Sequence, residues 1–296
     1  MQTKPIFLLY CCLAMFFLHS CVPQKQVSSS KKELSNINAS LENYNQSLKI
    51  LNETRDSKEK NNQIDDTANH RIRKFIDITQ AEIDTMIKNN SILIGETIVD
   101  KQDWDRLRNA LSSTRNSTKQ INNKILFLND LVSRNLVLKL DQDVVFEPGQ
   151  YRVSNGMAEN ITRQFEPAAR EIDLFIKKYP DIPLSLVITA KGYSDATIVP
   201  PGSQLQRELK QRLNLTSQEP DNKELNKELS RARAEAVKLL FQKFASTRPD
   251  SKAFQSKVLY LYEGKGEMPP DPKVTDYRTK DPRRRVVLLY WSVFPE

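Results

Sequence analysis

The sequence predicts an α+β protein with an all-helical first part and a second part in which strands and helices alternate. Between residues 24 and 147 there is no proline and one glycine, Gly95, whereas prolines recur from Pro148 to Pro295. Because proline and glycine interrupt helices, their absence permits long helices and their return marks turns. The first part also carries apolar residues at heptad spacing, and the second carries stretches of period two.

Three stretches of the first part place apolar residues three and four positions apart. Such spacing lays one apolar stripe along each helix, which suits knobs-into-holes packing. The pattern fits two arrangements, a three-helix bundle within one chain and an extended coiled coil between chains. We interpret 56–69 and 95–102 as the connections and expect a stalk without ligand chemistry. The stripes are Leu34, Ile37, Leu41, Tyr44, Leu48 and Leu51; Ile72, Ile76, Thr79, Ile83 and Met86; and Leu107, Leu111, Thr114, Thr118, Ile121, Ile125, Leu128 and Val132.

The second part alternates strand and helix patterns in the order βαβαββ, which predicts a small sandwich with helices on one face of a sheet. Pro167 is interpreted as a first-turn residue of the earlier helix, because proline needs no amide donor there. A further run, 204–213, has the composition of a helix. The predicted strands are 136–146, 184–190, 258–262 and 285–291, and the predicted helices are 167–179 and 229–244.

The N-terminus has the features of a bacterial export signal. Lys4 precedes an apolar run, 6–18, which is too short to span a bilayer and has the length of a signal-peptide core. The following Leu18-His19-Ser20-Cys21 resembles a lipobox. That resemblance implies cleavage after residue 20 and acyl chains, palmitate among them, on Cys21. Because Val22 is not the aspartate of inner-membrane retention, we expect an outer-membrane anchor facing the periplasm. The alternative is an ordinary signal peptide, or an inner-membrane anchor, with a chance cysteine.

Cysteine and histidine are too scarce for the common catalytic and metal sites. Cys11 and Cys12 would leave with the signal peptide, and lipid would occupy Cys21, so neither a disulfide nor a cysteine metal site is expected. His70 alone supplies neither a Ser-His-Asp triad nor a zinc site. We therefore expect no enzyme, no metal and no cofactor. The net charge of +8 favours a polyanion without choosing among nucleic acid, lipid and wall polymer.

Four segments of the second part resemble, in order, the motifs of the OmpA-like peptidoglycan-binding domain. That family has the patterns G-H-T-D, N-x-x-L-S-x-x-R-A, G-x-G-E and N-R-R-V. The resemblance covers about residues 136–296. The matching segments are Lys191-Gly192-Tyr193-Ser194-Asp195, Asn226-Lys227-Glu228-Leu229-Ser230-Arg231-Ala232-Arg233-Ala234, Gly264-Lys265-Gly266-Glu267 and Arg283-Arg284-Arg285-Val286.

The resemblance implies that Asp195 and Arg233 clamp the diaminopimelate of the peptidoglycan stem peptide, with Asn226 as a hydrogen-bonding neighbour. The candidate ligand-binding segment also includes Gly192, Tyr193 and Ser194. Diaminopimelate has a zwitterionic free end, which needs an acid for its ammonium and a base for its carboxylate. The planar fork of arginine suits the carboxylate. Ser230 is interpreted as the N-cap of the helix, which would place Arg233 in the first turn, near the positive end of the helix dipole.

The sequence departs from the family pattern at several positions. Tyr193 and Ser194 replace the usual His and Thr, and Arg283 replaces the usual asparagine. Arg284 and Arg285 are interpreted as fold or rim positions. The segment 196–225 is longer than is typical, and it could be a lid or a surface for another protein.

These features predict an outer-membrane lipoprotein that binds peptidoglycan noncovalently and tethers the membrane to the wall, without a nucleic-acid partner. The alternative is a periplasmic scaffold that recruits a protein through its helical region or through 196–225. Self-association through the helical region also fits. The expected parts are a signal peptide (1–20), a helical stalk or bundle (21–135) and an OmpA-like domain (136–296).

Overall fold

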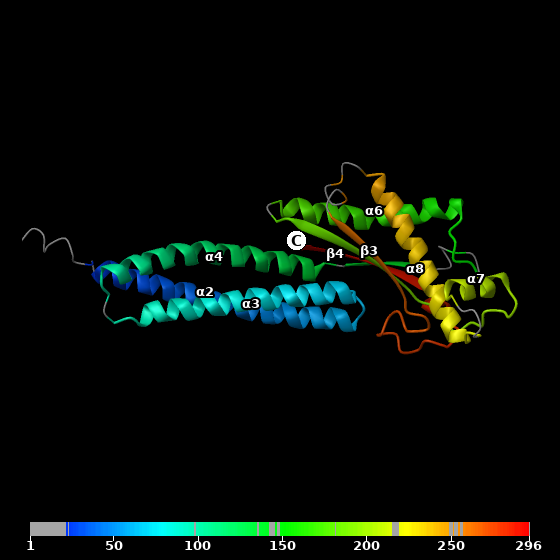
Figure 1. Cartoon of the computed structure of the whole chain (residues 1–296), viewed down its shortest axis with the longest axis horizontal. Helices are drawn as coiled ribbons and strands as arrows, with labels where there is room; N and C mark the ends of the chain where they lie inside the picture. Colours follow the sequence, from blue (N-terminus) through cyan, green and yellow to red (C-terminus); the bar gives the residue numbers. More distant parts are fainter. Residues whose placement is uncertain are drawn as a thin grey trace, which may run out of the picture. The chain divides into compact units, whose positions relative to one another are not determined.

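The computed structural model divides into two compact units, both drawn in Figure 1. The first contains the chain up to Leu51 together with Phe75–Leu128, and the second contains Asn52–Lys74 and Asn129–Glu296. Cys21 and the predicted signal segment lie outside the described residues. None of the helices in the described part combines the length and the apolar character needed to span a bilayer. The described residues are 22, 24–97, 99–134, 136–141, 146, 149–180, 182–214, 219–248, 251, 254 and 257–295.

The first unit is a bundle of three helices within one chain. It takes most of α2 (Gln24–Lys60), α3 (Asp66–Gly95) and α4 (Lys101–Ser133). The predicted stripes form its core, because each stripe faces the other two helices. Its fully buried apolar stripe residues include Leu34, Leu41, Leu48, Ile83, Ile121 and Leu128.

A polar layer interrupts this apolar core. Asn90 Nδ2 donates to Asn38 Oδ1 at 2.8 Å, and Thr114 Oγ1 donates to Asn90 Oδ1 at 3.1 Å. Each of the three helices contributes one of these side chains, and all three are less than 10% exposed. The layer therefore satisfies its own hydrogen bonds inside the bundle.

The connections between the helices are shorter than the sequence predicts. Helix α2 continues to Lys60 and α3 begins at Asp66, so most of the segment predicted as the first connection is helical. Asp65 Oδ1 accepts from the Ala68 amide at 2.8 Å, which caps the start of α3. The basic residues in the last turn of α2 are favourable at a helix C-terminus. The polar residues at the two ends of this segment form helical turns, whereas their composition alone predicts a loop.

The second unit contains a four-stranded sheet in the order β1-β4-β2-β3. Strands β2 and β3 pair in parallel, and β4 pairs antiparallel with β1 and β2. The two central strands, β2 and β4, are buried along almost their whole length, which explains their continuous apolar sequences. The strands are β1 (Val137–Asp141), β2 (Leu184–Gly192), β3 (Val258–Gly264) and β4 (Val286–Pro295).

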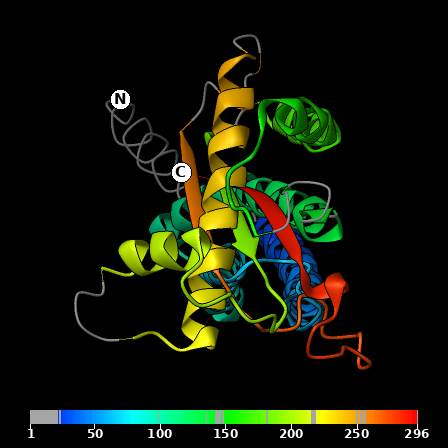
Figure 2. The same ribbon diagram turned by 90° about the vertical axis from the view of Figure 1, so that its right-hand side faces the viewer.

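Helices α6 (Asn155–Lys178) and α8 (Asn222–Ser246) cover one face of this sheet (Figure 2). The rings of Phe165 and Phe241 join them with centroids 5.0 Å apart. The predicted βαβαββ order is confirmed, with one added helix, α7 (Gln204–Arg212), at the predicted helical run. The assignment of Pro167 to a first turn is wrong, because α6 begins at Asn155 and Pro167 lies inside it.

The opposite face of the sheet contacts residues 61–71 of the same unit. Successive residues of a strand point to opposite faces. Gly192 faces α8, with Ser230 as its nearest neighbour, so Lys191 points the other way and pairs with Asp66. On that same face, the guanidinium of Arg71 lies 5.4 Å from the ring centroid of Phe294. The sheet is therefore covered on both faces within the second unit.

Candidate functional site

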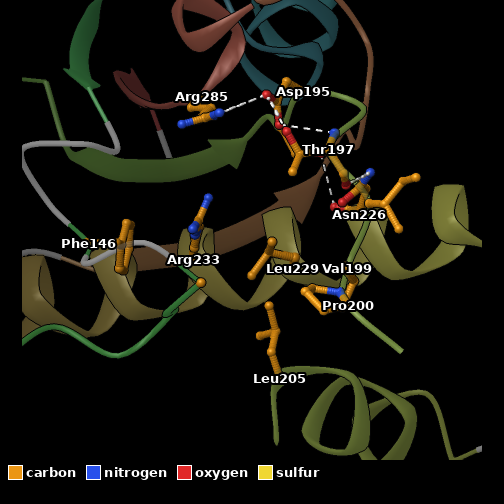
Figure 3. A pocket seen from close by; sticks show the side chains of 13 residues that line it. Phe146, Asp195, Thr197, Val199, Pro200, Leu205, Asn226, Leu229, Arg233 and Arg285 are labelled. Carbon is orange, nitrogen blue, oxygen red and sulfur yellow. Dashed lines mark hydrogen bonds and ion pairs between the residues drawn. The ribbon is translucent and has the colours of Figure 1, made fainter. Parts of the chain in front are cut away.

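A pocket of about 310 Å³ lies in the second unit, where the loop after β2 meets α8 and the start of β4. Figure 3 shows its ionic groups at one end and the apolar side chain of Leu205 at the other. The lining residues are Phe146, Gly149, Ser194, Asp195, Thr197, Ile198, Val199, Pro200, Leu205, Asn226, Leu229, Arg233 and Arg285.

Asp195 is the acid of this pocket and is only 4% exposed. Its Oδ2 accepts from Arg285 Nη2 at 3.0 Å and from Arg285 Nε at 3.1 Å. Thr197 Oγ1 donates to the same oxygen at 2.8 Å, whereas Oδ1 accepts from the Thr197 amide at 3.3 Å. Oδ1 therefore keeps more acceptor capacity for a ligand than Oδ2 does.

Arg285 also lines the pocket, where it pairs with Asp195, and its interpretation as a fold or rim position stays a prediction. A 3-10 helix, η2 (Pro282–Arg284), ends beside it, and its amide donates to Pro282 O at 2.8 Å. This turn directs the side chain toward Asp195 before β4 begins at Val286. The motif alone could not give this direction, because it depends on how the chain enters the sheet.

Arg233 lines the same pocket from α8. Its Nε donates to Gln150 O at 2.9 Å, and its guanidinium lies 5.3 Å from the ring centroid of Phe146. The residue is only 7% exposed. The backbone contact and the ring hold the guanidinium plane in place, and a fixed plane is what bidentate recognition of a carboxylate requires.

Helix α8 begins earlier than predicted, so the interpretation of Ser230 as its N-cap is wrong. Asp221 caps the helix and forms a capping box with Glu224. Ser230 lies in the third turn, where its hydroxyl donates to Lys227 O and accepts from the Gly266 amide. Arg233 therefore lies beyond the first turn, where the dipole of the helix no longer contributes.

Two glycines set the distance between the sheet and α8. A methyl group added at Gly192 would lie 2.0 Å from the carbonyl oxygen of Ser230, and one at Gly264 would lie 2.5 Å from that of Lys227. Only a residue without a side chain permits this approach. The structure thus gives Gly192 a packing role and places it outside the pocket lining.

The other two residues of the candidate segment, Tyr193 and Ser194, lie in different environments. Tyr193 is buried among Val286, Leu288 and Tyr290, outside the pocket lining, where burial raises the pKa of its phenol to about 12. Ser194 lines the pocket, and its hydroxyl donates to the Asn226 carbonyl at 3.2 Å. The structure therefore brings Ser194, but not Tyr193, to the pocket.

Asn226 holds the pocket wall together through its amide group. Its Nδ2 donates to Thr197 O at 3.2 Å and to Glu267 Oε1 at 2.8 Å. Residues 226, 229 and 233 recur at steps of three and four, so Asn226, Leu229 and Arg233 share one face of α8. This face presents an amide, an apolar group and a cation to the pocket.

The long segment after Asp195 supplies the apolar wall and is packed firmly on α8. Val199 and Leu209 are buried in a cluster with Leu225 and Leu229. On the same segment, Arg212 forms ion pairs with Glu228 at 2.8 Å and Glu235 at 2.7 Å. We considered two roles for this segment, a lid and a surface for another protein. Its contacts fix part of it on α8, where it forms a wall of the pocket.

The site is thus a small binding pocket with one acid and two arginines at one end and aliphatic side chains at the other. Among the described residues that line it there is neither a cysteine nor a histidine. Within the described ranges, no group of three or more His, Cys, Asp or Glu side chains is placed to hold a metal ion. Such a pocket suits a short aliphatic ligand that carries a carboxylate, and an ammonium in addition.

No protein-family model and no curated protein matches the sequence. Solved structures similar to the chain include OmpA-like and MotB-like domains. A MotB-like protein from Desulfovibrio vulgaris is 16% identical over 53% of this chain and 74% of its own, with a TM-score of 0.30. The OmpA-like domain of FopA1 from Francisella tularensis is 19% identical over 54% and 72%, with a TM-score of 0.27.

The periplasmic domain of Helicobacter pylori MotB is also similar, with 16% identity over 53% of this chain and 74% of its own and a TM-score of 0.27.

Proposed function

We propose that this chain is a lipoprotein of the outer membrane that binds the diaminopimelate of peptidoglycan stem peptides and so tethers the membrane to the wall. One observation carries the proposal. Asp195 and Arg233, which the motifs single out 38 positions apart in the sequence, line one pocket of about 310 Å³.

The free end of diaminopimelate matches the chemistry of this pocket. Its ammonium would bind Asp195 Oδ1, the oxygen with fewer protein donors. Its carboxylate would bind between Arg233 and Arg285, which both line the pocket. The methylene groups would contact Leu205 and the neighbouring aliphatic side chains.

The remaining parts of the chain have roles consistent with a tether. Acyl chains on Cys21 would anchor the protein, and the helical region would act as a spacer between anchor and pocket. A helix rises 1.5 Å per residue, so the 33 residues of α4 extend about 50 Å. The proposal includes no catalytic step, because neither a nucleophile–base pair nor a metal is needed to hold a ligand.

Calorimetric titration with a purified diaminopimelate muropeptide tests the binding. We expect Arg233→Lys to weaken binding roughly tenfold or more, because a point charge cannot replace a planar fork. Arg170→Lys, the same change at an exposed position on α6, is the matched control and should bind as the wild type does. A muropeptide with lysine in place of diaminopimelate lacks the second carboxylate and should bind far more weakly.

Wild-type protein that does not distinguish the two muropeptides would contradict the proposed ligand. The scaffold that recruits a protein partner would then be the better interpretation. The anchor is tested separately by Cys21→Ala, which should abolish lipid labelling and release the protein from the outer-membrane fraction. A variant that still labels with lipid would contradict the lipobox assignment.

A further inference from the structure

The turn between α2 and α3 is attached to the sheet by specific hydrogen bonds within the second unit. The Tyr290 hydroxyl donates to Asn62 O at 2.9 Å, and Asn62 Nδ2 donates to Pro270 O at 3.0 Å. Asn62 has a φ of 51°, a left-handed conformation that asparagine tolerates better than most residues. Asn62 uses both its backbone carbonyl and its side-chain amide in these bonds. These bonds hold it in this sparsely populated conformation.

Asp66, just after this turn, binds two lysines. Its Oδ2 lies 3.1 Å from Lys191 Nζ and 3.5 Å from Lys265 Nζ. Burial would raise the pKa of the Asp66 carboxyl, but the hydrogen bonds from the two lysines outweigh it and leave that pKa below its usual range. The Lys191 side chain is only 7% exposed and that of Asp66 is 73% exposed, so Asp66 binds the lysine where it reaches the surface.

The two lysines begin two loops, of which the first lines the pocket and the second supports it. Lys191 precedes Gly192 at the end of β2, and Lys265 precedes Gly266 after β3. The loops are joined by backbone hydrogen bonds, from the Lys265 amide to Gly192 O at 2.8 Å and from the Ser194 amide to Gly266 O at 2.8 Å.

The first loop lines the pocket through Asp195. The second loop carries Glu267, which lies outside the lining and accepts a hydrogen bond from the lining residue Asn226. One carboxylate outside the pocket therefore touches the base of both loops.

We infer that Asp66 is a positioning residue for the pocket: through Lys191 and Lys265 it fixes the two loops that carry Asp195 and Glu267. The inference rests on the proposed function for its ligand, but the positioning itself is a property of the unliganded protein. Asp66 does not line the pocket, so its effect on a ligand is transmitted only through the loops.

The physical reason is the burial of Lys191. Without the Asp66 charge, the Lys191 ammonium would keep the ring face of Tyr290, 5.4 Å from the ring centroid, but would have no carboxylate at ion-pair distance within the described part of the chain. A nearly buried ammonium that loses its counter-charge is destabilised unless it moves toward water. Because Lys191 is bonded directly to Gly192, that movement would disturb the turn before Asp195.

The test compares the full-length wild type with Asp66→Asn, Asp66→Glu and Asp77→Asn. Asp77 is an exposed acid on α3, so Asp77→Asn makes the same charge change elsewhere on that helix. Titration with the diaminopimelate muropeptide gives the affinity, and hydrogen exchange of residues 192–197 and 264–268 without ligand reports the loops. Urea unfolding reports global stability.

We expect Asp66→Asn to bind roughly three- to tenfold more weakly and to exchange faster in both loops, at nearly unchanged global stability. Asp66→Glu should restore most of both readouts, and Asp77→Asn should match the wild type. Wild-type affinity and exchange in Asp66→Asn would overturn the inference. Wild-type protein that binds no muropeptide would overturn the proposed ligand instead, and the exchange measurement would still decide the positioning.

Discussion

Arg285 and Asp195 form an ion pair in the pocket wall, with two guanidinium nitrogens 3.0 and 3.1 Å from a single carboxylate oxygen. Asp195 is nearly buried, whereas about a third of the Arg285 side chain is exposed. The acid therefore has two tasks, because it would bind the ligand's ammonium and it also fixes one of the two arginines. A change at Asp195 is expected to affect both.

A double-mutant cycle of Asp195→Asn and Arg285→Gln measures this coupling. We expect each single variant to lower the free energy of unfolding, with a coupling energy of about 1 kcal/mol, since the pair is partly exposed. Asp195 is only 4% exposed, so its substitution is expected to lower stability as well as binding. Additive effects in urea unfolding would show that the two side chains act independently.

Gly192→Ala should destabilise the second unit although Gly192 lines no pocket. The added methyl would meet the Ser230 carbonyl, which is backbone and cannot rotate away. We expect a loss of about 1–3 kcal/mol or more in the free energy of unfolding. Gly156→Ala is the control, because nothing lies within 4 Å of an added methyl there and alanine favours the helix. Equal stabilities of the two variants by urea unfolding would contradict the close approach.

Leu205→Ala should weaken ligand binding while leaving the fold intact. Leu205 is a partly buried wall residue on α7, so truncation removes apolar contact with the ligand's methylene groups. We expect a loss of roughly five- to thirtyfold in affinity for the muropeptide, equivalent to about 1–2 kcal/mol. Leu174→Ala, at an exposed position on α6, should bind as the wild type does. Unchanged affinity of Leu205→Ala would mean that the ligand does not reach this wall.

The stability of the second unit should fall at high pH because of Tyr193. Burial raises the pKa of its phenol from 10.0 to about 12 in the folded chain, although the hydrogen bond with Tyr290 lowers it. The neutral phenol thus contributes stability that is complete below pH 10 and is lost as the pH rises through about 12. Urea midpoints between these values should fall less steeply for Tyr193→Phe than for the wild type. Identical slopes would show that Tyr193 ionises as readily when folded.

The sequence was sufficient for the helical core and for the strand order, but not for the direction of every side chain. Heptad spacing predicted that Leu34, Leu41 and Leu48 are buried, because a stripe of apolar residues has to face another helix. The start of α8 was predicted wrongly at Ser230. The capping box of Asp221 and Glu224 was visible in the sequence, but it lay in a segment interpreted as an insertion.

Two site residues show why the motifs alone were not enough. Alternation along β2 could have separated Tyr193 from the pocket, since its neighbour Gly192 faces α8. Arg285 could not be placed in this way, because its direction depends on the 3-10 turn before β4. A motif gives the order of residues along the chain, whereas a pocket depends on the path that the chain takes between them.

The hydrogen-bonded layer of Asn38, Asn90 and Thr114 has a mechanical consequence for the first unit. An apolar seam alone allows one helix to slide past another by a heptad, because leucines meet leucines again. Here such a slip would leave buried amides without partners, at a cost of about 1–3 kcal/mol for each group. The three helices therefore have one preferred alignment. A pulling force along their axes has to break the hydrogen bonds of this layer before one helix can slide along the others.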